Sequence, residues 1–118
     1  MSGKRVLMTG ASTGIGAATA ALFANGGYEI ISLDIKDAPD DASQHYHCDL
    51  SDQKSIDDAL AKLDGRFDAL LNIAGVPGTV PAEVIMRVNT VGLKHLTEGV
   101  FDQLNDNAAI VSIASIAG

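Results

Sequence analysis

The stretch that decides the fold is Thr9-Gly10-Ala11-Ser12-Thr13-Gly14-Ile15-Gly16. It follows residues 5–9, a short apolar run without polar alternation, which is typical of a strand buried on both faces of a parallel sheet. It leads into residues 16–24, an alanine-rich segment closed by Asn25-Gly26-Gly27, as expected of a helix with a glycine stop. A strand, a glycine turn and a helix are therefore predicted to follow one another directly.

Strands and helices are predicted to alternate along the rest of the chain. Buried strands are expected over residues 28–34, 68–74 and 109–114, and a short strand over residues 46–48. This alternation predicts an α/β fold with a Rossmann-type, doubly wound parallel sheet. At 118 residues the chain is the length of one domain, residues 1–118.

Two further helices are expected between these strands. Apolar residues at spacings of three and four predict an amphipathic helix over residues 51–63, with Ser51 or Asp52 as its N-cap. A longer helix follows, and Asn105-Asp106-Asn107 is expected to end it. Its apolar stripe is predicted to consist of Leu93, Leu96, Val100 and Leu104.

Composition and charge exclude several kinds of partner. A formal net charge of −7 argues against nucleic acid or anionic lipid as a partner, because both require a basic surface. No apolar run is long enough to span a bilayer, and Gly10 interrupts the first one too early for a secretory signal. Cys48 is the only cysteine, so no intrachain disulfide forms, and we expect a reducing, cytoplasmic location.

The glycine turn has the chemistry of a phosphate-binding loop. A strand-to-helix turn places a dinucleotide pyrophosphate at the helix N-terminus, and glycines let the backbone approach it. The spacing G-x-x-x-G-x-G departs from the commoner G-x-G-x-x-G, so the assignment depends on the strand before the turn and the helix after it. The alternative is a glycine-rich turn that binds no ligand.

Asp34 is the candidate for recognising the cofactor ribose. It ends the second predicted strand, 18 residues after Gly16, where a carboxylate can accept hydrogen bonds from the ribose hydroxyls. The same charge repels a 2′-phosphate, so NAD(H) is favoured over NADP(H), although nearby Lys36 softens the preference. The alternative is a solvated carboxylate at a strand end.

The T-G-x-x-x-G-I-G form of the turn resembles the short-chain dehydrogenase/reductase family, and the resemblance covers the whole chain. Cys48-Asp49-Leu50 resembles the segment whose aspartate touches the adenine, and residues 72–75 resemble the N-N-A-G motif that steadies the central sheet, with Ile73 replacing the second asparagine. The resemblance implies a set of cofactor-binding residues, which are Gly10, Ser12, Thr13, Gly14, Ile15, Gly16, Asp34, Ile35, Asp49, Leu50, Asn72, Ala74 and Gly75.

Two further motifs imply catalytic residues. Val88-Asn89 resembles the family's helix asparagine, which helps to hold a water in the proton relay. Residues 115–118 resemble the S-x-x-G motif of the catalytic serine, so Ser115 is preferred to Ser112. Ser115 follows the last predicted strand, where its hydroxyl can hydrogen-bond a substrate oxygen.

The family's acid/base pair, a tyrosine with a lysine four residues later, has no counterpart in this sequence. Tyr28 is followed at that spacing by Ser32, and Tyr46 by Leu50. The chain is therefore expected to be truncated after the strand that carries the catalytic serine, and to be inactive alone. Residues 88–98 resemble the branch of 3-alpha-hydroxysteroid and coniferyl-alcohol dehydrogenases, which implies bulky substrates.

The resemblance implies that the intact enzyme transfers a hydride between a small-molecule alcohol or carbonyl substrate and NAD(H), as a homo-oligomer. The alternatives are a non-enzymatic NAD-binding module and an inactive fragment. A metal site is not expected, because His45 and His47 alternate on a predicted strand with no thiolate or carboxylate cluster of the right geometry. His95 is expected at the surface or in an interface.

Overall fold

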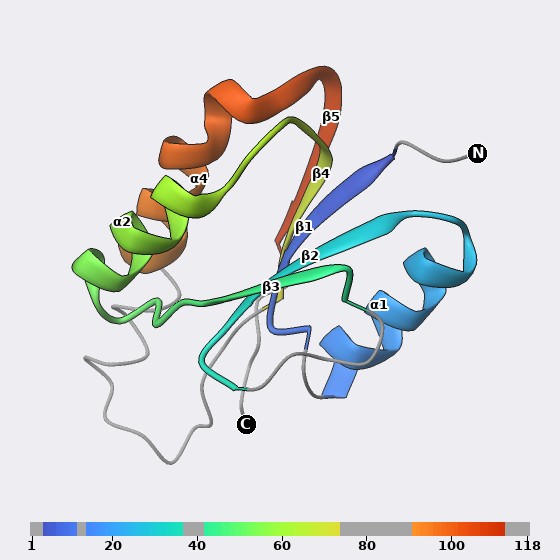
Figure 1. Cartoon of the computed structure of the whole chain (residues 1–118), viewed down its shortest axis with the longest axis horizontal. Helices are drawn as coiled ribbons and strands as arrows, with labels where there is room; N and C mark the ends of the chain where they lie inside the picture. Colours follow the sequence, from blue (N-terminus) through green and yellow to red (C-terminus); the bar gives the residue numbers. More distant parts are fainter. Residues whose placement is uncertain (1–3, 12–13, 37–41, 74–90, 113–118) are drawn as a thin grey trace.

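The computed structural model describes residues 4–11, 14–36, 42–73 and 91–112. Five strands form one sheet in the order β3-β2-β1-β4-β5, and every neighbouring pair is parallel (Figure 1). The strands are β1 (Arg5–Thr9), β2 (Glu29–Asp34), β3 (Gln44–His47), β4 (Phe67–Asn72) and β5 (Leu104–Ser112). The predicted α/β fold with a Rossmann-type parallel sheet is confirmed.

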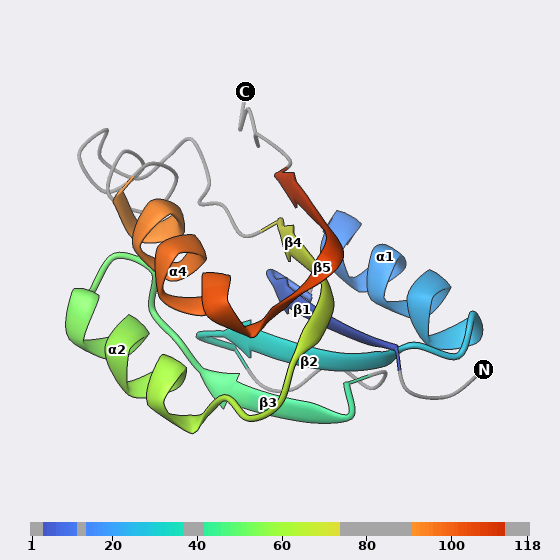
Figure 2. The same cartoon turned by 90° about the horizontal axis from the view of Figure 1, so that it is seen from above.

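Within the described residues, three α-helices cover the two faces of the sheet. They are α1 (Gly14–Asn25), α2 (Gln53–Lys62) and α4 (Leu93–Val100), and a 3-10 turn, η2 (Phe101–Gln103), follows α4. Helix α1 lies on one face, whereas α2 and α4 lie side by side on the other (Figures 1 and 2). The sheet is thus doubly wound, as the alternation of apolar segments predicts. No helix within the described ranges combines the length and apolar character needed to cross a membrane.

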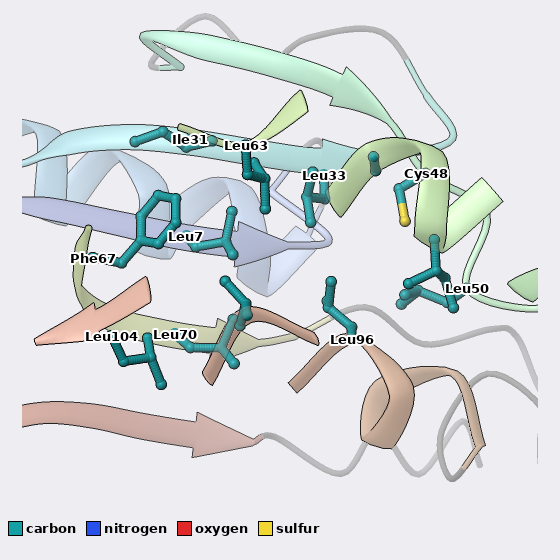
Figure 3. Packing of buried hydrophobic residues seen from close by; sticks show 13 residues of the cluster. Leu7, Ile31, Leu33, Cys48, Leu50, Leu63, Phe67, Leu70, Leu96 and Leu104 are labelled. Atoms are coloured by element: carbon teal, nitrogen blue, oxygen red, sulfur yellow. The ribbon is translucent and has the colours of Figure 1, made fainter. Parts of the chain in front are cut away.

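The position of β1 in the sheet explains why its sequence is a continuous apolar run. Val6 and Met8 pack in a cluster beneath α1, while Leu7 points to the opposite face and joins the larger cluster beneath α2 and α4. In that larger cluster, side chains from the strands meet Leu96 of α4 (Figure 3). Both faces of β1 are therefore buried, and successive side chains alternate between two cores.

Most predicted boundaries agree with the structure to within two residues. The prediction for β1 matches residue for residue, and β2 begins one residue later than expected. Helix α2 begins at Gln53 because the Asp52 side chain accepts a hydrogen bond from the Lys54 backbone N–H, which makes Asp52 the N-cap. Strand β3 ends at His47 instead of Cys48.

The prediction for residues 104–107 is wrong. Leu104 does not belong to the stripe of α4 but is the first residue of β5, and Asn105-Asp106-Asn107 lies within that strand. The cause is tertiary: Arg66 donates to the Leu104 carbonyl (2.8 Å) and to Asn105 Oδ1 (2.9 Å). Asn105 Nδ2 in turn donates to Asp68 Oδ1 (2.8 Å). These bonds hold the segment extended against β4, and helical spacing alone does not reveal them.

Candidate functional site

The carboxyl ends of all five strands lie at one edge of the sheet, called the carboxyl edge below, because the strands are parallel. The chain winds from β1 outward through β2 to β3, and then returns to the other side of β1 to form β4. This reversal creates a switch point between β1 and β4, where open α/β sheets bind their ligands. Predicted site residues end or follow four of the strands at this edge, with Gly10 at β1, Asp34 at β2, Asp49 at β3 and Asn72 at β4.

At the switch point, Gly10 follows β1 and Gly14 begins α1. Gly10 has φ of +73°, a conformation that favours glycine. Gly16 is buried in the first turns of α1, and a β-carbon added there would overlap the carbonyl oxygen of Gly10. These glycines let the start of the helix lie against the end of the strand. The backbone of Gly14 and Ile15 forms the first turn of α1.

Polar contacts fix the ends of β1 and β4 to each other. The Ile73 backbone N–H donates to Thr9 Oγ1 (3.1 Å), and Thr9 pairs in register with Asn72. Asn72 is 2% exposed, and its Nδ2 donates to Thr97 Oγ1 (3.3 Å) on α4 and to Ser112 Oγ (3.4 Å) on β5. Asn72 thus links β4 to α4 and β5, and its place beside a cofactor stays a prediction.

Asp34 lies at the end of β2, half-buried, where the ribose prediction requires it. The Lys36 backbone N–H donates to Asp34 Oδ1 (3.1 Å), which fixes the carboxylate at the strand end. The Asp34 carbonyl accepts a hydrogen bond from the Cys48 backbone N–H (3.0 Å), so the segment that follows β3 lies beside the end of β2. Ile35 is 59% exposed and is available to contact a ligand.

Asp49 and Leu50 follow β3 and face different surroundings. Asp49 Oδ1 accepts bonds from the Ser51 backbone N–H (2.9 Å) and hydroxyl (2.6 Å). Leu50 is buried in the core beneath α2 and α4. Its side chain also lines a cavity of about 290 Å³ between these helices, together with Ser51, Gln53, Ile56, Val91, Gly92 and His95.

Cys48 is buried between two carboxylates. Burial, together with the negative charges of Asp49 and Asp34, raises the pKa of the Cys48 thiol from 9.0 to about 11. The thiol is therefore protonated at neutral pH and contributes to the core as a small apolar side chain.

The remaining predicted site residues lie outside the described part of the chain. They are Ser12, Thr13, Ala74 and Gly75 for the cofactor, and Asn89 and Ser115 for catalysis. Their assignment stays a prediction.

Comparison with known proteins identifies the family. The family model for short chain dehydrogenases matches residues 4–118. The chain belongs to the short-chain dehydrogenase family. Coniferyl-alcohol dehydrogenase of a Pseudomonas species is 36% identical over 118 residues, which cover 100% of this chain and 46% of that protein. Protein FixR of Bradyrhizobium diazoefficiens is 35% identical over 142 residues, covering 98% and 51% respectively. The chain spans about half the length of these curated relatives.

Solved structures show the same fold. The aldohexose dehydrogenase of Thermoplasma acidophilum superposes with a TM-score of 0.81 at 28% identity, covering 95% of this chain and 49% of that one. An oxidoreductase of the short chain dehydrogenase/reductase type from Brucella ovis gives a TM-score of 0.81 at 29% identity, with coverages of 97% and 62%. This dehydrogenase-family chain thus shares the fold of the matched parts of these structures.

The structure adds two polar residues that the sequence does not single out. Thr97 contacts Asn72, and Ser55 Oγ accepts the Asp49 backbone N–H (2.9 Å). The sequence pattern could have identified Thr97. It follows Leu93 by four residues and precedes Val100 by three, so it is a polar residue on the apolar stripe of its helix. Ser55 has no such signal.

Two of the three histidines make side-chain contacts in the structure. His45 Nδ1 lies 3.0 Å from Ser32 Oγ on the neighbouring strand, and His95 Nε2 lies 2.6 Å from Asp57 Oδ1, joining α4 to α2. Within the described ranges, no group of three or more side chains has the arrangement of a metal site.

The Gly10–Gly16 approach predicts a strong effect of adding one methyl group. We expect Gly16→Ala to destabilise the fold by about 3 kcal/mol, because the new β-carbon forces the turn away from β1. Gly26→Ala is the matched control: its β-carbon would meet neighbouring atoms only at 3.4 Å or more, so we expect a change below about 1 kcal/mol. Urea denaturation measures both, and equal effects of the two substitutions would contradict the account.

The raised pKa of Cys48 predicts a pH-dependent loss of stability. The folded pKa of about 11 lies above the unfolded value of 9.0, so the unfolded chain loses its proton first as the pH rises. The contribution of this thiol to stability is complete below pH 9 and is lost between pH 9 and about 11. Urea denaturation across this range should show a steeper decline for the unmodified chain than for Cys48→Ala. Parallel declines in the stability of the two proteins would show that folding does not raise the pKa of the Cys48 thiol.

Proposed function

We propose that residues 1–118 form the nicotinamide-cofactor domain of an oxidoreductase that transfers a hydride between an alcohol or carbonyl compound and NAD(H). The observation that carries the proposal is the approach of Gly16 to the Gly10 carbonyl, which places the N-terminus of α1 at the switch point, where helix N-termini bind phosphate groups. Membership of the short-chain dehydrogenase family supports the same reading.

Each part of the cofactor has a proposed partner at the carboxyl edge. The glycine turn, with Ser12 and Thr13, binds the pyrophosphate, and Asp34 with Ile35 binds the adenosine ribose. Asp49 and Leu50 border the adenine, and Asn72, Ala74 and Gly75 hold the central part of the edge. The bound cofactor supplies the hydride chemistry. Asn89 supports the proton relay, and Ser115 orients the substrate oxygen.

Asp34 is the proposed reason for a preference for NAD(H). Its carboxylate at the end of β2 accepts hydrogen bonds from the ribose hydroxyls and repels a 2′-phosphate. The fold itself accommodates the other cofactor, since the structural neighbour BdcA was solved in complex with NADPH. The choice therefore depends on local charge and not on the architecture.

The relatives support a substrate class and a cellular setting. A relative that matches the whole chain is a coniferyl-alcohol dehydrogenase, which favours a bulky alcohol or its carbonyl product as substrate. The single buried cysteine fits a reducing compartment, and we propose that the protein acts in the cytoplasm, as a homo-oligomer when intact.

A second candidate is an NAD-binding module or an inactive fragment. No tyrosine in this sequence has a lysine four residues later, so the usual acid/base pair is missing from these residues. On β5, Ile110 and Val111 are 45% and 44% exposed, and an exposed apolar strand favours association with other chains. Both observations are compatible with a chain that performs no chemistry alone.

The proposal predicts that NADH binds more tightly than NADPH. Asp34→Ala should narrow the difference by about tenfold, because it removes both the ribose acceptor and the repulsion of the 2′-phosphate. Calorimetric titration at fixed salt measures both affinities. Asp58→Ala, which removes an exposed carboxylate of α2, is the control and should leave the difference unchanged. Equal affinities of the unmodified chain for the two cofactors would contradict the role of Asp34.

The missing acid/base pair predicts that the purified 118-residue chain does not oxidise coniferyl alcohol with NAD. The rise of NADH absorbance measures turnover, and a sustained rise would show that other residues supply the proton transfer. Sequencing the gene beyond the codon for Gly118 then separates the two candidates. A downstream tyrosine with a lysine four residues later supports the enzyme, and its absence supports the module.

A further inference from the structure

We propose that Thr97 is a positioning residue of this dehydrogenase: through the Asn72 amide it fixes helix α4 relative to strand β5 at the carboxyl edge. The inference rests on the proposed function, because α4 follows Asn89 in the chain and β5 precedes Ser115. Asn89, proposed for the proton relay, and Ser115, proposed for substrate orientation, are thus close in sequence to the two elements that this contact joins.

The contact joins three elements through one buried group. Asn72 ends β4, and its Nδ2 lies 3.3 Å from Thr97 Oγ1 on α4 and 3.4 Å from Ser112 Oγ on β5. A side-chain amide carries two N–H donors, so one nitrogen serves both hydroxyl groups at once. Because Asn72 is 2% exposed, water does not compete well for these bonds.

The orientation of the Asn72 amide depends on these two hydroxyl groups. Its Oδ1 has no hydrogen-bond partner among the described residues, so the oxygen does not anchor the group there. The main chain beside it is fixed separately, because Asn72 pairs in register with Thr9 on one side and Ser112 on the other. Loss of the Thr97 hydroxyl therefore removes the polar link from α4 to β4 while the sheet keeps its register.

Packing alone does not explain a threonine at position 97. Leu96 and Val100 of the same helix are fully buried in the core beneath α2 and α4, and a valine would fill the volume of Thr97 equally well. The hydroxyl is the part of the side chain that contacts Asn72. The contact lies close in sequence to both proposed catalytic residues. Thr97 lies eight residues after Asn89, and Ser112 lies three residues before Ser115.

The test compares Thr97→Val, which removes the hydroxyl at constant shape, with Thr97→Ser, which keeps it. Backbone hydrogen–deuterium exchange is measured on the 118-residue chain without ligand. We expect Thr97→Val to accelerate exchange about tenfold in peptides from α4 and from the end of β5, and less than about twofold in β2 and β3. Thr97→Ser should restore the slow exchange.

A double-variant comparison tests whether Asn72 transmits the effect. In an Asn72→Leu background, Thr97→Val should add no further change, because its partner is already absent. If Asn72→Leu does not fold, Ser112→Ala replaces it and should accelerate exchange in the same two segments. The proposal is overturned if Thr97→Val affects all strands equally, if Thr97→Ser behaves like Thr97→Val, or if the effect persists in full without Asn72.

Calorimetry with NADH separates this inference from the proposed function. In the unmodified chain, failure to bind NADH would count against the proposed cofactor domain, whereas the exchange experiment without ligand decides the role of Thr97 independently. If NADH binds, it should protect α4 and β5 further in the unmodified chain and in Thr97→Ser but not in Thr97→Val. Equal protection in all three would overturn the positioning role.

Discussion

The rest of the structure depends on one backbone contact, the approach of Gly16 to the carbonyl oxygen of Gly10. No side chain fits between them, so the first helix begins directly against the end of the first strand. This close packing places the N-terminus of α1 at the switch point. The first N–H groups of a helix and the positive end of its dipole favour an anion there. The same contact fixes how α1 covers its face of the sheet, because α1 packs on β1 and β2.

The contacts at the amino ends of the strands, called the amino edge, differ in role from those at the carboxyl edge. At the amino edge, the Arg5 backbone N–H and the Asn105 side chain both donate to Asp68, and these hydrogen bonds hold the pKa of its carboxyl below the usual value. Arg66 ties the start of β5 to the same region. These bonds fix strand ends that carry no proposed chemistry. At the carboxyl edge, buried contacts of Thr9 and Asn72 align the strands, while Asp34 and Asp49 remain at the rim.

The sequence predicts those elements whose signal is local. The apolar run of β1 and an N-cap at Ser51 or Asp52 each follow from neighbouring residues; the structure confirms the strand and shows that Asp52 is the cap. The start of β5 could not be predicted in this way, because Leu104 continues a helical spacing and contacts with the distant Arg66 and Asp68 side chains hold the segment extended. The contact of Thr97 with Asn72 also joins residues far apart in the chain, so spacing within the helix identifies the residue but not its partner.

The central claim is that the cofactor binds at the carboxyl edge, with its pyrophosphate against the glycine turn. An NMR titration of the isotope-labelled chain with NADH tests it most directly, because each backbone amide reports its own surroundings. The account predicts that the signals of Gly10, Gly16, Asp34 and Asp49 move, while those of Arg66, Asp68 and Asn105 at the amino edge do not. Shifts confined to the amino edge, or no shifts in a folded chain, would contradict it.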